Sequence, residues 1–198
     1  AAMSAFGVLC GMTVPMLCLP TAFIGALGLV LVPKLSQSVA LGRIDEVRRR
    51  IHKSLLATSV LTMPALAILV VLGPTIGVFL FREPTVGDYM VPLSVGVLLS
   101  CYQSVLSGAL NGIGRQAAAA RTSLICGAVQ LGCTWVFMGL PGVGLGGYVA
   151  GFVLSSTLGV LLNYLEIARR TALKPRLFQW CTAPVLAALL MGLVINLL

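Results

Sequence analysis

The sequence predicts an all-helical membrane protein, a polytopic bundle of about six transmembrane helices in a single domain over residues 1–198. Composition is the first reason: 59% of the residues are hydrophobic, only 9% are charged, and the mean hydropathy is +1.06. A soluble domain carries roughly a quarter charged residues, so too few charges remain here to cover a surface that faces water. The other two reasons are the length of the apolar stretches and the distribution of basic residues between them.

Six apolar stretches are long enough to cross a bilayer, which takes about 20 residues of helix. Lipid cannot hydrogen-bond a bare backbone, and the alternating pattern of barrel strands is absent, so each stretch is predicted to be a helix. Their expected limits are Gly11–Val32, Leu55–Phe81, Tyr89–Ile113, Ala117–Leu140, Val143–Ala168 and Leu177–Leu198. Prolines inside them predict kinks or short broken turns, at Pro15, Pro20, Pro64, Pro74, Pro92 and Pro184.

Basic residues are concentrated in alternate loops. Of the 13 Lys and Arg residues, six follow the first span, two follow the third and four follow the fifth, whereas Arg82 alone follows the second. Twelve against one is the asymmetry that the positive-inside rule describes. The twelve are therefore expected to face the cytoplasm, and both ends of this chain are expected on the outer side of the plasma membrane.

The first cytoplasmic loop is predicted to contain a short amphipathic helix, within residues 36–54. In the stretch GRIDEVRRRIHKSLL, Ile44, Val47 and Ile51 recur at helical spacing. Acidic residues precede arginines by four positions, which is the favourable order on a helix. Its basic side chains are expected to contact anionic lipid headgroups at the inner surface, and they are Arg48, Arg49, Arg50 and Lys53. A solvated linker without a further role is the alternative interpretation.

The stretch GVGLGG, residues 142–147, has the G-x-G-x-x-G spacing of a dinucleotide-binding turn. That turn needs a preceding strand and an acidic residue about 20 positions on. Membrane spans flank the glycines instead, and Glu166 is expected at the opposite face of the membrane, so no nucleotide is expected. Small residues at spacing four predict close helix packing. They are Gly147, Gly151, Ser155 and Gly159 in the fifth span, and Gly96, Ser100, Ser104, Gly108 and Gly112 in the third.

A polar row, Gln103, Ser107 and Asn111, runs beside the small residues of the third span. Gln130 in the fourth span and Asn163 in the fifth are polar as well. Such side chains are costly against lipid and usually face a bundle interior or a wet cavity. Two interpretations stay open for these five residues: hydrogen bonding between helices, and lining of a substrate path.

Residues for catalysis or metal binding do not gather in the sequence. The five acidic residues lie in loops or at a helix end, and none stands at mid-membrane or pairs with a base. The only histidine, His52, is far from any cysteine, and most of the six cysteines lie inside apolar runs. The net charge of +8 sits in short loops rather than on one basic face. We therefore expect no enzyme, cofactor, metal or nucleic-acid partner.

Three stretches carry a family resemblance. LPTAFIGALGLVLVPKLSQSVALGRIDEVRRRIHKSLLAT, SVLSGALNGIGRQ and GVGLGGYVAG, in that order, resemble stage V sporulation protein B and related polysaccharide-export flippases. The features of the first stretch are Val32-Pro33, Ser36, Gly42 and the basic run Arg48 to Lys53. The family belongs to the multidrug/oligosaccharidyl-lipid/polysaccharide superfamily, which is MATE-like. The resemblance implies a second, C-terminal lobe, with an N-terminal lobe and a last span outside this chain.

The function implied by the resemblance is the flipping of a lipid-linked oligosaccharide or cell-wall precursor by alternating access, as part of a larger protein. The polar headgroup would cross through the cavity while the lipid tail stays in the membrane. Membrane lipids and the missing lobe are then the expected partners. One alternative is a cation-coupled multidrug exporter of the same superfamily, whose buried acidic residue would lie outside this chain. Another is a non-transporting scaffold or an inactive truncated product.

Overall fold

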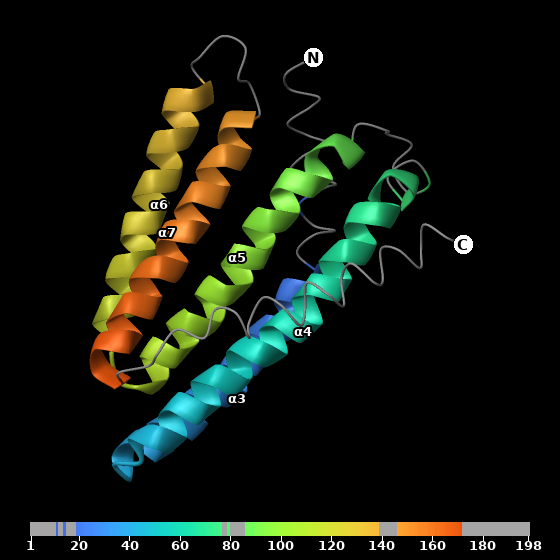
Figure 1. Ribbon diagram of the computed structural model, residues 1–198. Coiled ribbons are helices and arrows are strands. Elements are labelled where there is room, and N and C mark those ends of the chain that lie inside the picture. Colours follow the sequence, from blue (N-terminus) through green and yellow to red (C-terminus); the bar gives the residue numbers. More distant parts are fainter. Residues whose placement is uncertain are drawn as a thin grey trace.

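The computed structural model describes residues 11, 14, 19–76, 79, 86–138 and 146–171. The major elements of these residues are five long α-helices and two short turns, one between the first two helices and one between the third and fourth, and the described residues contain no strand. In chain order the helices are α3 (Leu19–Ala40), α4 (Ile44–Ile76), α5 (Val86–Gly112), α6 (Gln116–Met138) and α7 (Gly146–Thr171) (Figure 1). The predicted all-helical class is confirmed.

Helix length and hydropathy match a bilayer. The shortest of the five, α3, has 22 residues, which at 1.5 Å per residue gives about 33 Å against a hydrocarbon core of about 30 Å. Among the described residues, four helices are long and apolar enough to cross a membrane: Thr21–Ala40, Ile44–Ile68, Leu93–Gly112 and Gly147–Thr171. The fifth helix, α6, was also expected to span the membrane, but it is not among these four, because Arg121 and Gln130 lower its mean hydropathy. The expected sixth span, 177–198, lies outside the described residues.

The segment 36–54 does not form a separate linker helix. Residues 36–40 complete α3, and residues 44–54 are the first turns of α4, which continues to Ile76. The physical reason is the apolar face of Val47, Ile51 and Leu55, each at most 1% exposed, which continues into the span without a helix-stopping signal. The expected breaks at Pro64, Pro74 and Pro92 do not occur, because α4 and α5 remain helical through these residues. Pro20 lies in the first turn of α3, and Pro15 and Pro184 lie outside the described residues.

Two glycines end helices in the same way. Gly42 and Gly114 have φ of 68° and 76°, a left-handed conformation that suits a residue without Cβ. The amides of Gly42 and Arg43 donate to the carbonyls of Val39 and Ser38, and the amides after α5 repeat this pattern. Both ends are therefore Schellman caps, which satisfy carbonyls that each helix leaves unpaired.

Helix α5 is central, because it packs extensively against α3, α4 and α7, whereas α6 packs mainly on α7. The core between them contains fully buried Ile24, Leu35, Leu110 and Ile167. Other large apolar side chains are exposed, among them Trp135 at 85%. Exposed apolar surface on this scale suits lipid rather than water.

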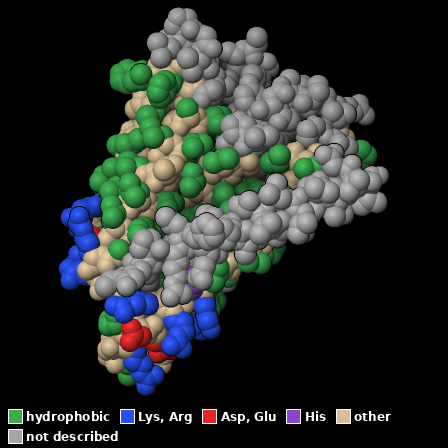
Figure 2. Space-filling model, viewed as in Figure 1, with side chains coloured by type: hydrophobic (Ala, Val, Ile, Leu, Met, Phe, Trp, Pro, Cys, Tyr) green, Lys and Arg blue, Asp and Glu red, His purple; other side chains and the backbone are tan. Residues whose placement is uncertain are grey.

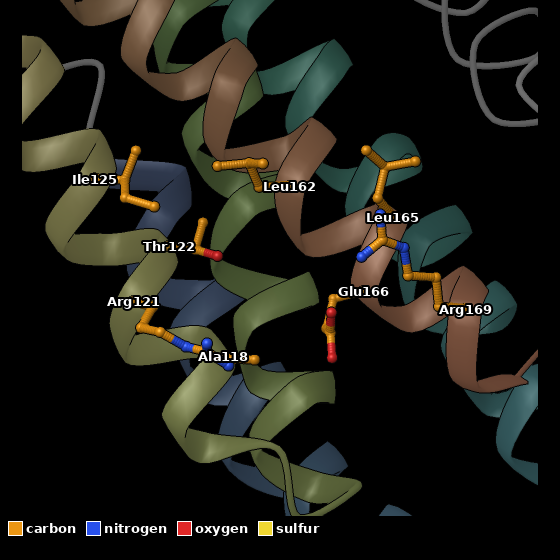
Figure 3. A pocket seen from close by; sticks show the side chains of 8 residues that line it. All are labelled: Ala118, Arg121, Thr122, Ile125, Leu162, Leu165, Glu166 and Arg169. Carbon is orange, nitrogen blue, oxygen red and sulfur yellow. The ribbon is translucent and has the colours of Figure 1, made fainter.

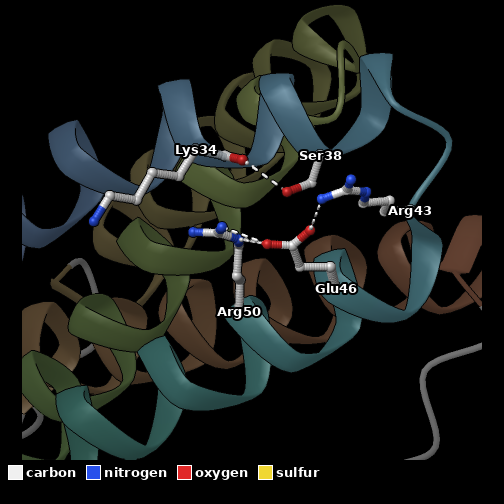
Figure 4. Close-up of polar contacts among 5 residues, drawn as sticks. All are labelled: Lys34, Ser38, Arg43, Glu46 and Arg50. Carbon is white, nitrogen blue, oxygen red and sulfur yellow. Dashed lines mark hydrogen bonds and ion pairs between the residues drawn. The ribbon is translucent and has the colours of Figure 1, made fainter.

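The two turns and the C-terminal end of α7 lie at one end of the bundle (Figure 1). Figure 2 shows that Lys and Arg side chains gather at this end, which we call the basic end. Acidic partners hold part of this charge in place. Figure 4 shows the Glu46 carboxylate between Arg43, at 3.8 Å, and Arg50, whose Nε donates to it at 3.2 Å.

Candidate functional site

An open cavity of about 450 Å³ lies on α5, where α3 and α6 border it. Helix α5 supplies Ser100, Gln103, Ser104, Ser107, Gly108 and Asn111, α3 supplies Gly25, Gly28 and Val32, and α6 supplies Ser123. None of these side chains is charged, so the cavity offers hydrogen bonds and close backbone approach rather than ionic contacts. We call it the α5 cavity.

The polar lining follows from helical spacing. Gln103, Ser107 and Asn111 are four residues apart, which places them along one face of α5. Within the described part of the chain, Ser107 and Asn111 make no side-chain hydrogen bond to another helix. Their hydroxyl and amide groups therefore remain available to a ligand or to water, whereas Ser100 donates to Val97 on its own helix at 2.8 Å.

Gln103 lies at the border between the α5 cavity and α7. A Cβ built on Gly159 would lie 2.4 Å from the Gln103 Cδ, so the amide of Gln103 rests against the glycine backbone of α7. The side chain thus both lines the cavity and contacts α7. Asn163, one turn further along α7, donates through Nδ2 to the backbone carbonyl of Gln103 at 3.5 Å.

Two of the five polar residues singled out in the sequence lie away from the α5 cavity. Asn163 is 1% exposed between α5 and α7, and its Oδ1 has no hydrogen-bond partner among the described residues. Gln130 is half-buried on α6, and its backbone carbonyl oxygen lies 3.6 Å from a Cβ built on Gly151 of α7. The structure therefore brings Gln103, Ser107 and Asn111 together and leaves Gln130 and Asn163 elsewhere.

Small residues set the walls of the cavity by letting α3 approach α5. A Cβ on Gly108 would lie 3.7 Å from the Gly28 Cα, and one on Gly112 would lie 2.8 Å from the Leu35 Cβ. Ser36 on α3 donates to the Gly112 carbonyl at 3.0 Å, which closes the contact at the basic end.

The small residues of α7 and of the start of α5 serve other neighbours. Gly151 and Ser155 face α6, where the Ser155 hydroxyl donates to the Cys126 carbonyl at 2.8 Å. Gly96 faces α7, because a Cβ there would lie 2.5 Å from the Phe152 ring. Gly147 lies in the first turn of α7, while most of the preceding glycine turn lies outside the described residues.

Sequence reasoning missed four residues of the cavity wall: Gly25, Gly28, Val32 and Ser123. The i, i+3 pair Gly25 and Gly28 was the available signal, since two small residues on one helix face allow close approach of another backbone. Ser123 carried no signal beyond being polar in an apolar helix.

The basic residues expected to contact lipid divide into two kinds. Arg48 donates through Nε to the Thr171 carbonyl at the end of α7 and pairs with Asp45 at 2.9 Å, and Arg50 pairs with Glu46. The other two, Arg49 and Lys53, are exposed.

Among the described residues, no group of three or more His, Cys, Asp or Glu side chains could hold a metal ion.

A bundle of long apolar helices that carries an open, uncharged, hydrogen-bonding cavity suits a polytopic membrane transport protein. The sequence model of the family described as lipid II flippase MurJ matches residues 13–198. The chain therefore belongs to the lipid II flippase MurJ family, plasma-membrane transporters of a lipid-linked cell-wall precursor within the MATE-like superfamily. Comparison with curated proteins and with solved structures gave no match. The family transports its substrate and is not a family of enzymes.

Proposed function

We propose that the α5 cavity is part of the path along which the headgroup of lipid II, or of a closely related lipid-linked precursor, crosses the membrane. The observation that carries the proposal is the polar row of α5. Ser107 and Asn111 face the cavity and make no hydrogen bond to another helix within the described residues. Unused donors and acceptors can bind sugar hydroxyls, amides or pyrophosphate oxygens, whereas lipid acyl chains offer them no hydrogen-bond partner.

The proposal includes an N-terminal, first lobe that lies outside this chain. The α5 cavity is open, and alternating access requires a facing wall that can approach and withdraw. We infer that a first lobe provides this wall, together with the charged groups that an anionic pyrophosphate would need. The MurJ family match favours a lipid flippase over a cation-coupled multidrug exporter. The sporulation branch of the superfamily stays a prediction.

The orientation is part of the same proposal. The gathering of Lys and Arg side chains at one end of the bundle supports a cytoplasmic basic end, and both ends of the chain would then lie outside. Exposed Arg49 and Lys53 would contact anionic headgroups at the inner surface.

The test replaces Gln103 and Asn111 with alanine in the full-length gene product. If they line the path, transport in reconstituted vesicles falls about tenfold, since each lost hydrogen bond to substrate is worth about 0.5–1.5 kcal/mol. The melting temperature falls by only a few degrees, because an interhelical hydrogen bond in lipid is worth roughly 0.6 kcal/mol.

Gln130→Ala is the matched control, since it removes the same side chain from a position away from the α5 cavity. It should leave transport unchanged. Full transport by the double variant, or a loss in proportion to lost folded protein, would return Gln103 and Asn111 to a purely structural role.

A further inference from the structure

A second pocket, of about 230 Å³, lies between α6 and α7 near the basic end. We call it the α6/α7 pocket. Figure 3 shows the side chains that line it: Ala118, Arg121, Thr122 and Ile125 from α6, and Leu162, Leu165, Glu166 and Arg169 from α7. It shares no lining residue with the α5 cavity. The transport path proposed above therefore does not account for it.

The pocket has an excess of positive charge. Arg115 donates to the Glu166 carboxylate through Nε at 3.2 Å and through a terminal nitrogen at 2.7 Å, so the one acidic group is already paired. Arg121 donates only Nε, to the Ala117 carbonyl at 3.3 Å. Within the described residues, no hydrogen bond or ion pair engages the guanidinium of Arg169. Two exposed arginines thus present unused donors to an anion.

The remaining wall is apolar and continues along an exposed apolar side of α6 and α7. Ile125 is 48% exposed and Leu165 is 42% exposed, although both line the pocket. Further along the same two helices, large apolar side chains are also exposed: Leu124, Leu131, Trp135 and Val136 on α6, and Leu154 and Leu161 on α7. A soluble anion would leave this surface uncovered, whereas an anion that carries acyl chains would cover it.

We propose that the α6/α7 pocket binds one anionic glycerophospholipid. Its phosphate lies between the guanidinium groups of Arg121 and Arg169, and its acyl chains follow Ile125 and Leu162 toward the membrane interior. The bound lipid belongs to the leaflet that meets the basic end. Because it contacts both α6 and α7, it holds these two helices together where they reach the membrane surface.

The test measures lipid binding to the 198-residue chain in an uncharged detergent by native mass spectrometry. Short-chain phosphatidylglycerol is the probe, and phosphatidylcholine of the same chain length is the comparison. The wild-type chain should bind one phosphatidylglycerol more tightly than phosphatidylcholine. Arg121→Gln and Arg169→Gln should each weaken that binding about fivefold, since a basic residue near anionic lipid is worth about 1 kcal/mol.

Arg43→Gln is the matched control. Arg43 is an exposed arginine at the same basic end, away from the pocket, and its loss should leave the dissociation constant unchanged. Equal weakening by Arg43→Gln would show diffuse attraction to the whole basic end and would overturn the proposal. Equal binding of phosphatidylcholine would overturn it as well, and competition by millimolar inorganic phosphate would assign the pocket to a free anion.

A second variant keeps the test decisive if the glutamine variants do not fold, as judged by circular dichroism. Ala118→Leu retains both arginines but places a larger side chain where Ala118, 8% exposed, lines the pocket. It should weaken phosphatidylglycerol binding with all charges present. Unchanged binding by a folded Ala118→Leu variant would overturn the proposal.

Discussion

Gly112→Ala should destabilise the bundle because the added methyl group meets atoms that cannot move away. It would lie 2.8 Å from the Leu35 Cβ and 3.1 Å from the Val32 carbonyl oxygen. Leu35 is fully buried, and the Val32 carbonyl belongs to the backbone of α3. The clash can be relieved only by pushing α3 away from α5. Overpacking of this kind costs about 1–3 kcal/mol.

The same substitution at two other helical glycines isolates this cost. A Cβ on Gly108 would lie 3.7 Å from the Gly28 Cα, an ordinary contact, and a Cβ on Gly127 would meet nothing within 4 Å. Gly108 and Gly127 both lie inside helices and gain a similar helix propensity on substitution by alanine, so Gly127→Ala is the baseline. Gly112→Ala should melt about 2–12 °C below Gly127→Ala in detergent. Gly108→Ala should melt within about 2 °C of that baseline.

The assay is the change in far-ultraviolet circular dichroism on heating, at one protein concentration and one detergent. A Gly112→Ala variant that melts with Gly127→Ala would refute the close contact of α3 and α5. A large loss for Gly108→Ala would also refute it, since the structure gives that position room for a methyl group.

Three further predictions concern the ion pair, the buried amide and the orientation. A double-mutant cycle with Arg115→Gln and Glu166→Gln should give a favourable coupling energy at low salt that shrinks as salt is added, because the pair is partly exposed; additive effects at low salt would contradict this. Asn163→Leu should keep or raise the melting temperature, because it removes a buried Oδ1 without a partner among the described residues and loses only the long 3.5 Å bond from Nδ2 to the Gln103 carbonyl; a loss of more than about 2 kcal/mol would show that Oδ1 has a partner. In a background without the six native cysteines, an impermeant thiol reagent should label Gly142→Cys in sealed cells but not Leu41→Cys, whose position is 58% exposed at the basic end. The reverse pattern of labelling would invert the proposed topology.

Hydropathy and local spacing were sufficient for the fold class and for the existence of most helices. A chain with so few charged residues suits lipid as its solvent rather than water, and lipid requires a backbone that satisfies its own hydrogen bonds. The spacing of four also puts Gln103, Ser107 and Asn111 on one face of α5 whatever surrounds it. Helix ends were less certain: the short amphipathic helix expected over 36–54 is divided by the turn at Gly42.

Only the tertiary structure decided which way each polar face points. In a helix surrounded by lipid, apolar residues occupy both the packed side and the exposed side, so periodicity does not distinguish the interior from the exterior. Gln130 and Asn163 looked equivalent to Gln103 in the sequence, yet the packing of α6 and α7 turns them away from the α5 cavity. The small residues opposite the polar row, Gly28 and Ser123, enter the cavity wall because contacts between helices set the rotation of α3 and α6, and no local pattern encodes that rotation.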